Sequence, residues 1–460
     1  MARKSVVRMW VDEWIDRSAL QHPARLAIGS FAIAIGITTA LLSLPLATAS
    51  GRRPPFIDSL FVGTSAVTVT SLTTVDTGTY WSPFGKVVIL IAMQAGGLGI
   101  MTMAALLGLA VSRKLGLTSR MVTAEEVRAN GPGDVRTVLR TIFIVTAAVE
   151  GVIALVLFIR LLAHGFPAAT AAFQGVFYAV SGFTNAGFVA QPGGIVPFPG
   201  DAFFRLTMAA GPFLGALGFP VYLNLVRSWR RPKAWSLHTK LTLVTIGVLQ
   251  TVSIVFLAAF EWTNPATLGA LSGSSRVWQL LFVSVNQRTG GLSGINHGAM
   301  HEHTWLLEDV LMFIGGGSGG TSGGIKVTTL AVLLLAIWAE ARGRRDMEAF
   351  GKRIGTEVLR LAVAVTLVSL FVVIVGTMVV LAQSVGEGFT LGQVVFEVIS
   401  AFATVGISTG ITPFLPFGAK VTVIIVMFIG RVGSLTVVAA LALNRQRRVI
   451  RYPSERPLVG

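Results

Sequence analysis

Residues 392–412, GQVVFEVISAFATVGISTGIT, join a short apolar segment directly to a cluster of Gly, Ser and Thr. The apolar part, at 390–402, has only about a dozen residues, whereas a helix needs about 20 to cross the hydrocarbon of a bilayer. Long apolar segments flank this stretch at 356–382 and 417–443. We therefore interpret 390–402 as a half-helix that enters a membrane from outside and returns through the polar cluster at 403–409.

The composition of the whole chain indicates lipid as its solvent. Of the 460 residues, 53% are hydrophobic and 13% are charged, and the mean hydropathy is +0.73. Apolar runs long enough to cross a bilayer recur along the sequence, so we expect an integral membrane protein without a separate soluble domain. The sequence contains no cysteine, which excludes disulfides and thiolate metal ligands.

The net charge of +16 could indicate a nucleic-acid partner, but its distribution argues otherwise. Lys and Arg gather in alternate connections between apolar runs, whereas the connections at 164–170, 189–200, 262–275 and 383–390 contain neither. By the positive-inside rule the basic segments, and with them both termini, are expected in the cytoplasm. Topology thus explains the charge, and we expect no nucleic-acid partner.

The pattern around 392–412 occurs four times, each copy with a long span, a short helix, a polar cluster and a second span. The other short helices are expected near 56–68, 168–182 and 275–286. We predict an all-α membrane protein with four pseudo-symmetric helix–pore-helix–helix repeats around a central pore, with eight full spans. The repeats are 26–112, 138–226, 239–340 and 356–443, and the cytoplasmic segments are 1–25, 113–137, 227–238, 341–355 and 444–460.

The four polar clusters match one another position by position. They read TVTSLTTVD (68–76), SGFTNAGF (181–188), NQRTGGLSG (286–294) and FATVGISTG (402–410). One such cluster is more often a helix-packing site or a loop. Four in register can surround an aqueous path, where backbone carbonyls replace the hydration shell of a monovalent cation. The candidate filter residues are Thr70, Ser71, Ala186, Gly187, Gly290, Gly291, Val405 and Gly406.

Several motifs resemble the Trk/Ktr/HKT superfamily of potassium and sodium transporters, and most closely its bacterial Ktr-type membrane subunits. They are AVTVTSLTTVDTG (66–78), MQAGGLGIMT (93–102), SGFTNAGF (181–188), RTGGLS (288–293), GGTSGGIKVTT (319–329), SAFATVGISTGIT (400–412) and FIGRVGSLT (428–436). The resemblance implies a fourfold pseudosymmetric pore, one filter glycine per repeat and an intramembrane gate below the filter. It also implies a homodimer on a cytosolic RCK-type ring of regulatory subunits that bind a nucleotide (ATP, ADP or NAD).

The first repeat departs from the family pattern because Ser71 stands where the resemblance implies a glycine. A serine side chain there narrows or reorients one quarter of the ring, and among plant members this change accompanies sodium preference. A plain packing role for Ser71 is the alternative. Three glycines, Gly187, Gly291 and Gly406, remain at the corresponding positions.

A glycine-rich run at 315–324 interrupts the longest apolar segment, which spans 305–340. Seven glycines cost a helix about 1 kcal/mol each relative to alanine, so we expect a loop between two half-helices. We interpret it as a mobile plug, consistent with the family's gate; a phosphate-binding loop is excluded because Ile325 separates Gly324 from Lys326. Lys326 would hold the loop closed, repel cations, or snorkel to the inner surface. The expected gate residues are Gly315, Gly316, Gly317, Ser318, Gly319, Gly320, Thr321, Ser322, Gly323, Gly324 and Lys326.

Four further charges lie near the expected pore. Arg431 lies inside the last span, where the resemblance implies a barrier to cation flow below the filter. Glu397 could pair with a basic group behind the filter, with Arg288 as one candidate, and Asp76 could concentrate cations at the mouth. Scaffolding is the alternative role for Glu397, Arg288 and Asp76. The outer-loop histidines at 297–303 form a weak candidate metal cluster.

The function expected from these features is channel-like uptake of potassium, or of sodium, across the plasma membrane, the inner membrane of a bacterium. The alternative, a sodium-preferring or poorly selective uniporter, rests on Ser71. A membrane-embedded enzyme would need a Ser/His, paired Asp or His-Glu-x-x-His arrangement in the spans, and the sequence contains none. We expect no cofactor in this chain beyond the transported ion.

Overall fold

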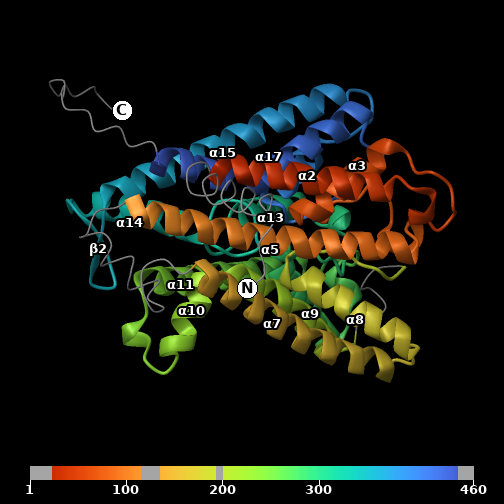
Figure 1. Cartoon of the computed structure of the whole chain (residues 1–460), viewed down its shortest axis with the longest axis horizontal. Coiled ribbons are helices and arrows are strands. Elements are labelled where there is room, and N and C mark those ends of the chain that lie inside the picture. The colour runs from red at the N-terminus through yellow and green to blue at the C-terminus, as the bar shows by residue number, and fades with distance from the viewer. Residues whose placement is uncertain (1–22, 115–134, 193–199, 444–460) are drawn as a thin grey trace, which may run out of the picture.

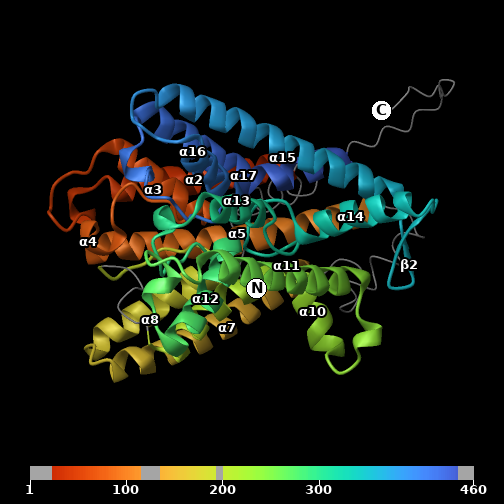
Figure 2. The same cartoon turned by 180° about the vertical axis from the view of Figure 1, so that it is seen from behind.

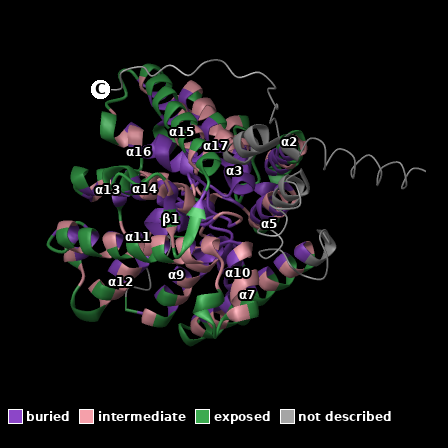
Figure 3. Cartoon of the chain, turned by 90° about the vertical axis from the view of Figure 1, so that its left-hand side faces the viewer, coloured by how far each residue is buried: buried purple, intermediate pink, exposed green. Residues whose placement is uncertain are grey.

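The computed structural model of this chain describes residues 23–114, 135–192 and 200–443. Most of the expected cytoplasmic segments 1–25 and 113–137, and all of 444–460, lie outside the described residues. The described chain is mostly helical, and its long helices run side by side along the longest axis of the molecule (Figures 1 and 2). Viewed along that axis, the buried residues gather in the middle and the exposed ones at the rim (Figure 3).

The order of elements repeats four times along the described chain, each time as a long helix, a short helix and a return to the bundle. The first unit contains α2 (Pro23–Leu42), α3 (Phe56–Thr68), α4 (Thr77–Tyr80) and α5 (Pro83–Lys114), and the second α7 (Val135–Ala163), α8 (Ala168–Phe183), α9 (Ala202–Leu217) and α10 (Phe219–Ser228). The third contains α11 (Leu237–Glu261), α12 (Gly273–Val285), α13 (Glu302–Phe313) and α14 (Val327–Ala341), and the fourth α15 (Thr356–Gln383), α16 (Leu391–Ala403) and α17 (Phe417–Leu443).

The long helices suit a membrane. Five of them, α2, α5, α7, α11 and α15, are long and apolar enough to cross a bilayer, and the bent pair α9–α10 makes a sixth candidate. The 27-residue α17 and the interrupted pair α13 and α14 occupy the corresponding places in the fourth and third units. The short helices have 13 to 16 residues. They are therefore too short to cross a bilayer.

The short helix of the fourth unit shows how its ends are fixed. Thr390 and Gln393 form a capping box at the start of α16, in which each side chain bonds the backbone N–H of the other residue. The helix ends where Thr404 adopts a left-handed conformation with φ 49°. Every residue from Phe396 to Ala403 is buried, so α16 lies inside the bundle. The chain therefore turns in the protein interior.

The return of the second unit differs from the continuous span expected at 202–226. A bend of 94° separates α9 from α10 at Gly218. Gly218 has φ 86°, and a Cβ there would lie 3.0 Å from the backbone nitrogen of Gly320, so only glycine fits. Pro220 follows in the first turn of α10, where proline is tolerated.

A second feature missed from the sequence is a β-hairpin in the expected linker 341–355. Strands β1 (Met347–Ala349) and β2 (Lys352–Ile354) pair antiparallel, with Ala349 opposite Lys352. Phe350 and Gly351 form the two-residue turn, and both have positive φ, as this hairpin type requires. Met347 and Ile354 are buried against a small cluster that includes Ala339, which anchors the hairpin to α14.

Candidate functional site

The four short helices lead into four loops that meet inside the bundle. We call residues 69–72, 184–188, 286–292 and 404–407 the central loops. Ser71, Gly187 and Gly291 are in close contact: a Cβ placed on Gly187 would lie 2.5 Å from Ser71 Oγ and 2.8 Å from the carbonyl carbon of Gly291. A Cβ on Gly406 would overlap Thr70 O and Ser71 Cβ. The positions aligned from the sequence are thus neighbours in space.

Each aligned residue has the same unusual backbone conformation. Ser71, Gly187, Gly291 and Gly406 have φ of 74°, 64°, 67° and 87°. Glycine adopts such angles readily, whereas a serine does so at an energetic cost. The sequence pattern of one serine and three glycines therefore corresponds to one shared backbone geometry.

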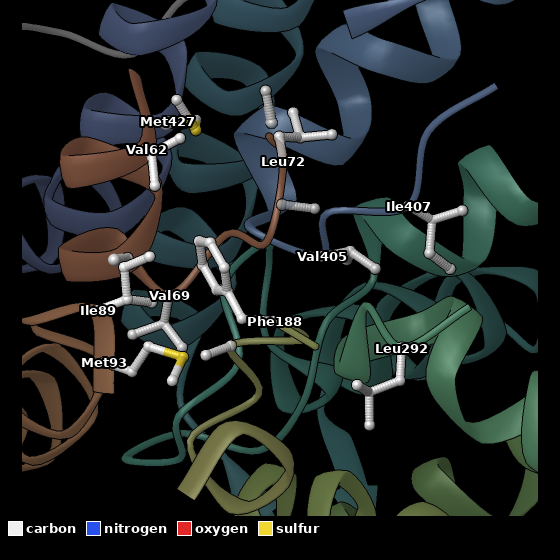
Figure 4. Packing of buried hydrophobic residues seen from close by; sticks show 14 of the residues in the cluster. Val62, Val69, Leu72, Ile89, Met93, Phe188, Leu292, Val405, Ile407 and Met427 are labelled. Carbon is white, nitrogen blue, oxygen red and sulfur yellow. The ribbon is translucent and has the colours of Figure 1, made fainter. Parts of the chain in front are cut away.

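The residue after each of these positions anchors its loop. Leu72, Phe188, Leu292 and Ile407 are at most 2% exposed. Figure 4 shows these four side chains spread around the place where loops from all four units meet. The apolar side chain packs into the bundle in every unit, which holds the preceding backbone at the meeting point.

The same hydrogen bond joins three of the central loops to their short helices. The backbone N–H groups of Thr70, Ala186 and Val405 donate to the carbonyls of Ser65, Ser181 and Ser400, at 2.8, 2.8 and 3.0 Å. Each bond closes the C-terminal end of its helix, where the helix dipole places partial negative charge. The helix ends that meet here therefore favour a cation.

The carbonyl groups at the meeting point accept no hydrogen bond within the described part of the chain. Among the described residues, none donates a hydrogen bond to the carbonyl oxygen of any of the eight candidate filter residues. Buried carbonyls without a partner are uncommon and need an explanation. Oxygen atoms of this kind can coordinate a monovalent cation. The eight are Thr70, Ser71, Ala186, Gly187, Gly290, Gly291, Val405 and Gly406.

The third central loop is built differently from the other three. Residues Asn286–Gly290 form one turn of π-helix, and Gly291 N donates to Asn286 O at 3.1 Å. The Gln287 side chain donates to Ser253 Oγ at 2.6 Å, which ties the loop to α11. Arg288 is buried, and its Nη1 lies 3.4 Å from Ile246 O on the same helix.

The expected glycine loop is present between α13 and α14. We use this name for residues 314–326. Its two ends are joined side by side, because Gly315 N donates to Ile325 O and Ile325 N donates to Phe313 O, both at 3.0 Å. Ile314 and Ile325 form an isolated parallel bridge there. The interruption of the third unit therefore starts and ends at one point.

The tip of the glycine loop is bonded to the second unit. Gly317 N donates to Ala216 O at 2.7 Å, and Thr321 N donates to Gly215 O at 3.1 Å. The Thr321 hydroxyl donates to Phe183 O at 3.1 Å and lies 2.6 Å from the side-chain amide of Asn185. The loop thus touches the end of α8, immediately before the second central loop.

The glycine loop also contacts the fourth unit, and Arg431 of that unit links the loop to the first unit. Arg431 donates from Nη1 to Thr321 O, and its Nη2 lies 3.4 Å from Gly96 O on α5. A Cβ on Gly323 would overlap Thr404 Oγ1, so the loop passes against the end of α16. Lys326 donates to Ser322 O at 2.6 Å and so binds the loop to itself. The positive charges expected near the gate both contact the loop.

Two acidic residues have structural partners. Glu397 is buried and accepts hydrogen bonds from Ser408 Oγ, at 2.9 Å, and from Thr412 Oγ1, which holds the chain after the fourth central loop. The pairing of Glu397 with Arg288 is not present, because Arg288 instead faces α11. Asp76 caps α4 by accepting from Gly78 N at 3.0 Å and from Thr79 Oγ1 at 2.8 Å.

Some residues of the site were not identified from the sequence. Asn185 links the second central loop to the glycine loop, and Gly96 supplies a carbonyl to Arg431. The repeated serines were also missed, although Ser65, Ser181 and Ser400 each precede an aligned filter position by the same spacing. That constant spacing was a signal that could have been found. The outer histidines His301 and His303 stack on each other, and no group suited to a metal ion occurs among the described residues.

Comparison with known proteins gives one consistent result. The model of the TrkH family, described as a cation transport protein, matches residues 13–451. The Ktr system potassium uptake protein B of Bacillus subtilis is 37% identical over 438 residues, which covers 95% of this chain and 96% of the relative. The potassium/sodium uptake protein NtpJ of Enterococcus hirae is 34% identical, with 95% and 97% covered.

The fold has a solved counterpart. The crystal structure of the potassium transporter TrkH from Vibrio parahaemolyticus superimposes with a TM-score of 0.68 at 16% sequence identity. The match covers 91% of this chain and 85% of that structure. At this identity the likeness speaks for the shared fold alone.

Proposed function

Because this chain belongs to the TrkH family of cation transport proteins, we propose that it conducts a monovalent cation, in the first place potassium, across the plasma membrane. The observation that carries the proposal is the meeting of four central loops whose eight carbonyls have no partner among the described residues. A dehydrated cation needs such oxygen atoms in place of its water shell. The sequence relatives named for potassium uptake support the same ion.

In this proposal the central loops form the selectivity filter and the glycine loop forms the gate. The glycine loop lies against the ends of α8 and α16, next to the filter, and Arg431 links it to Gly96 of the first unit. Opening would require its bonds to Gly215, Ala216 and Arg431 to break. Arg431 would add an electrostatic barrier to cations while it holds the loop.

Ser71 supports a second candidate, in which the chain prefers sodium or selects poorly. Its side chain is partly buried and lies against Gly187, Gly291 and Gly406. A hydroxyl and an extra carbon at this point narrow the ring of carbonyls, which favours the smaller ion. NtpJ of Enterococcus hirae is named for both potassium and sodium uptake.

Ion flux in proteoliposomes tests the function. The purified full chain is reconstituted, and uptake of radioactive rubidium and sodium is measured under an inside-negative potential. We expect uptake of at least one ion, with competition by unlabelled potassium or sodium that reveals the preference. Absence of flux for both ions, in vesicles where the chain is folded and inserted, contradicts the proposal. Reversal potentials that follow chloride would assign an anion pathway instead.

The remaining expectations stand as proposals on the same basis. The repeats are 26–112, 138–226, 239–340 and 356–443, the pore is central, and both termini lie in the cytoplasm. The chain forms a homodimer and binds a cytosolic RCK-type ring, through which ATP, ADP or NAD acts. The relative in Bacillus subtilis is named as part of a Ktr system, which supports a partner subunit. Copurification with a soluble ring-forming subunit, and a nucleotide response lost without it, test this.

A further inference from the structure

The connection after the second unit carries concentrated positive charge. Residues 227–235, RSWRRPKAW, which we call the basic turn, contain three arginines and one lysine. All four side chains are exposed, and within the described residues none of them forms an ion pair. Between Asp201 and Glu261 the sequence has no acidic residue. Its positive charge is therefore not neutralised by any ion pair among the described residues. The four are Arg227, Arg230, Arg231 and Lys233.

The basic turn and α10 also have an exposed apolar surface. Val226 is 77% exposed and Trp229 is 65% exposed, and the Arg230 guanidinium lies 5.0 Å from the Trp229 ring. The turn has a fixed shape, because Trp235 Nε1 donates to Ser228 O at 3.0 Å and Ser236 N donates to Asn224 Oδ1 at 3.2 Å. Tryptophan and arginine side by side are typical of the boundary between lipid tails and headgroups.

The orientation of α10 places this surface beside the bundle. Because α10 turns by 94° from α9, a membrane-crossing α9 leaves α10 approximately parallel to the bilayer plane. In Figures 1 and 2, α10 and the turn after it project sideways from the bundle, at the same end as the β-hairpin. An amphipathic helix in this position has its apolar face in the lipid boundary and its basic residues at the headgroups.

We propose that α10 and the basic turn bind the headgroups of anionic phospholipids in the cytoplasmic leaflet. Clusters of four or more Lys and Arg directly after a membrane span attract such lipids. The β-hairpin at the same end is less suited to bind anionic lipid, because acidic residues partly balance its positive charge. Arg353 pairs with Asp346 at 2.8 Å, and Glu348 adds a second carboxylate. The sideways position and the exposed Trp229 favour lipid over a cytosolic protein as the occupant.

The bound lipid acts on the glycine loop through the start of α10. Phe219 N donates to Gly319 O at 3.3 Å, and a Cβ on Gly319 would lie 2.7 Å from the Phe219 ring. Tyr222 Oη donates to Leu214 O at 2.6 Å, which ties α10 to α9. We expect a displacement of α10 to move Phe219, its first residue, as well. This second step rests on the proposed function, whereas the lipid binding does not.

Lipid retention tests the binding. The full chain is purified in detergent from membranes that contain phosphatidylglycerol, and the bound lipid per chain is measured by mass spectrometry. The variant with Gln at all four basic positions of the turn should bind this lipid more than about tenfold more weakly than the wild type. The matched control carries Arg342→Gln, Arg344→Gln, Arg345→Gln and Lys352→Gln, which removes the same charge from the hairpin end, and should retain the lipid.

Equal retention by the basic-turn variant and the wild type overturns the proposal. If that variant retains lipid but no longer binds a cytosolic partner, the surface belongs to a protein instead. Folding is checked by size-exclusion chromatography, and the milder pair Arg230→Gln with Arg231→Gln should give an intermediate loss of lipid.

Flux tests the second step. Rubidium uptake is compared in vesicles of phosphatidylcholine with and without phosphatidylglycerol. Phe219→Ala should retain the lipid but lose the response of uptake to it. Leu223→Ala, on the same helix but with its side chain beside Met101 and Val138, should keep both. An unchanged response in Phe219→Ala contradicts the coupling. If the wild type conducts no ion in any lipid, the proposed function fails, while the retention experiment still decides the binding.

Discussion

The central loops and the glycine loop both place irregular backbone inside an apolar bundle, yet they satisfy that backbone in opposite ways. In three of the central loops a backbone N–H is bonded to the end of the short helix, as from Thr70 to Ser65 O, whereas the carbonyls of the candidate filter residues have no partner among the described residues. In the glycine loop the carbonyls are used as well: Thr321 O accepts from Arg431, Gly319 O from Phe219, and Ser322 O from Lys326.

This difference indicates what each loop can do. Backbone in a membrane needs partners, so the free carbonyls of the central loops require a ligand such as a cation. The glycine loop is held by individual hydrogen bonds to the second and fourth units, and each such bond contributes only modestly to stability. This contrast supports the proposed function, in which the central loops are a fixed site for an ion and the glycine loop is a closure that can be released.

The largest expected effect is on the central loops. Gly406→Val places a Cβ against Thr70 O and Ser71 Cβ in a backbone with φ 87°, so rubidium uptake should fall more than about tenfold. Gly410→Val is the matched control, because Gly410 has φ 96° with open space around it. Equal loss of uptake in both variants would mean that backbone strain alone, and not the meeting of the loops, matters.

A variant that releases the glycine loop should increase ion uptake rather than reduce it. Arg431→Met keeps an unbranched apolar stem but removes the guanidinium and its bonds to Thr321 and Gly96, so basal uptake should rise by a few-fold. Arg276→Met, which removes an arginine bonded to Leu271 O at the outer end of α12, is the control and should leave uptake unchanged. Slower uptake in Arg431→Met would show that the loop does not close the path.

Substitution of Ser71 tests whether the first central loop differs from the other three in ion selectivity. Ser71→Gly should shift the ratio of potassium to sodium permeability toward potassium by a few-fold, because the fourth quarter of the ring then matches the other three. Ser71→Ala keeps the Cβ and removes the hydroxyl, which separates the effect of size from that of polarity. Reversal potentials in mixed salts measure the ratio. An identical ratio in all three proteins removes Ser71 from selectivity.

The smallest effect on transport is expected far from both loops. Asp201 caps α9 and accepts from Arg160 Nη2 and His164 Nε2, both at 2.8 Å. Burial opposes its ionisation, but the hydrogen bonds from Phe204, His164 and Arg160 outweigh burial and keep the pKa of Asp201 below 3.8. Asp201→Asn should lower the thermal midpoint by a few degrees without a change in selectivity.

The pH dependence of this link has a definite sign. Because the folded-state pKa of Asp201 is depressed, its stabilisation is complete above pH 3.8 and is lost as the pH falls through the folded-state pKa. The difference in thermal midpoint between wild type and Asp201→Asn should therefore be constant near neutral pH and shrink in acid. A difference that grows toward acid pH would contradict the assignment of the ionised carboxylate.

The sequence predicted the fold well where physical constraints are strict. Helix α3 begins at Phe56 and ends at Thr68, as expected, because a short apolar run and a polar cluster leave little freedom inside a bilayer. The glycine run disrupts a helix on propensity alone, and the structure has a loop there. Family membership, the helical fold and the transport class were likewise confirmed, whereas the filter and gate assignments remain predictions.

Features that depend on contacts between distant residues were not predictable from the sequence. The break at Gly218 exists because this glycine packs against the loop at Ser318–Gly320, about 100 positions along the chain, and a single sequence does not reveal that neighbour. The partner of Arg288 was wrong for the same reason: charge alone suggested Glu397, while the fold directs Arg288 toward a carbonyl of α11. The hairpin at 347–354 is shorter than patterns of alternation can detect.

The parallel bridge between Ile314 and Ile325 has a mechanical consequence. It holds the two ends of the glycine loop together. In the gating that we propose, the tip moves aside while α13 and α14 keep their spacing. The cross-sectional area that the bundle occupies in the bilayer is then the same before and after the swing. Membrane tension does work only when the area of the protein in the bilayer changes. Stretching the bilayer is therefore not expected to shift the balance between the two positions of the loop.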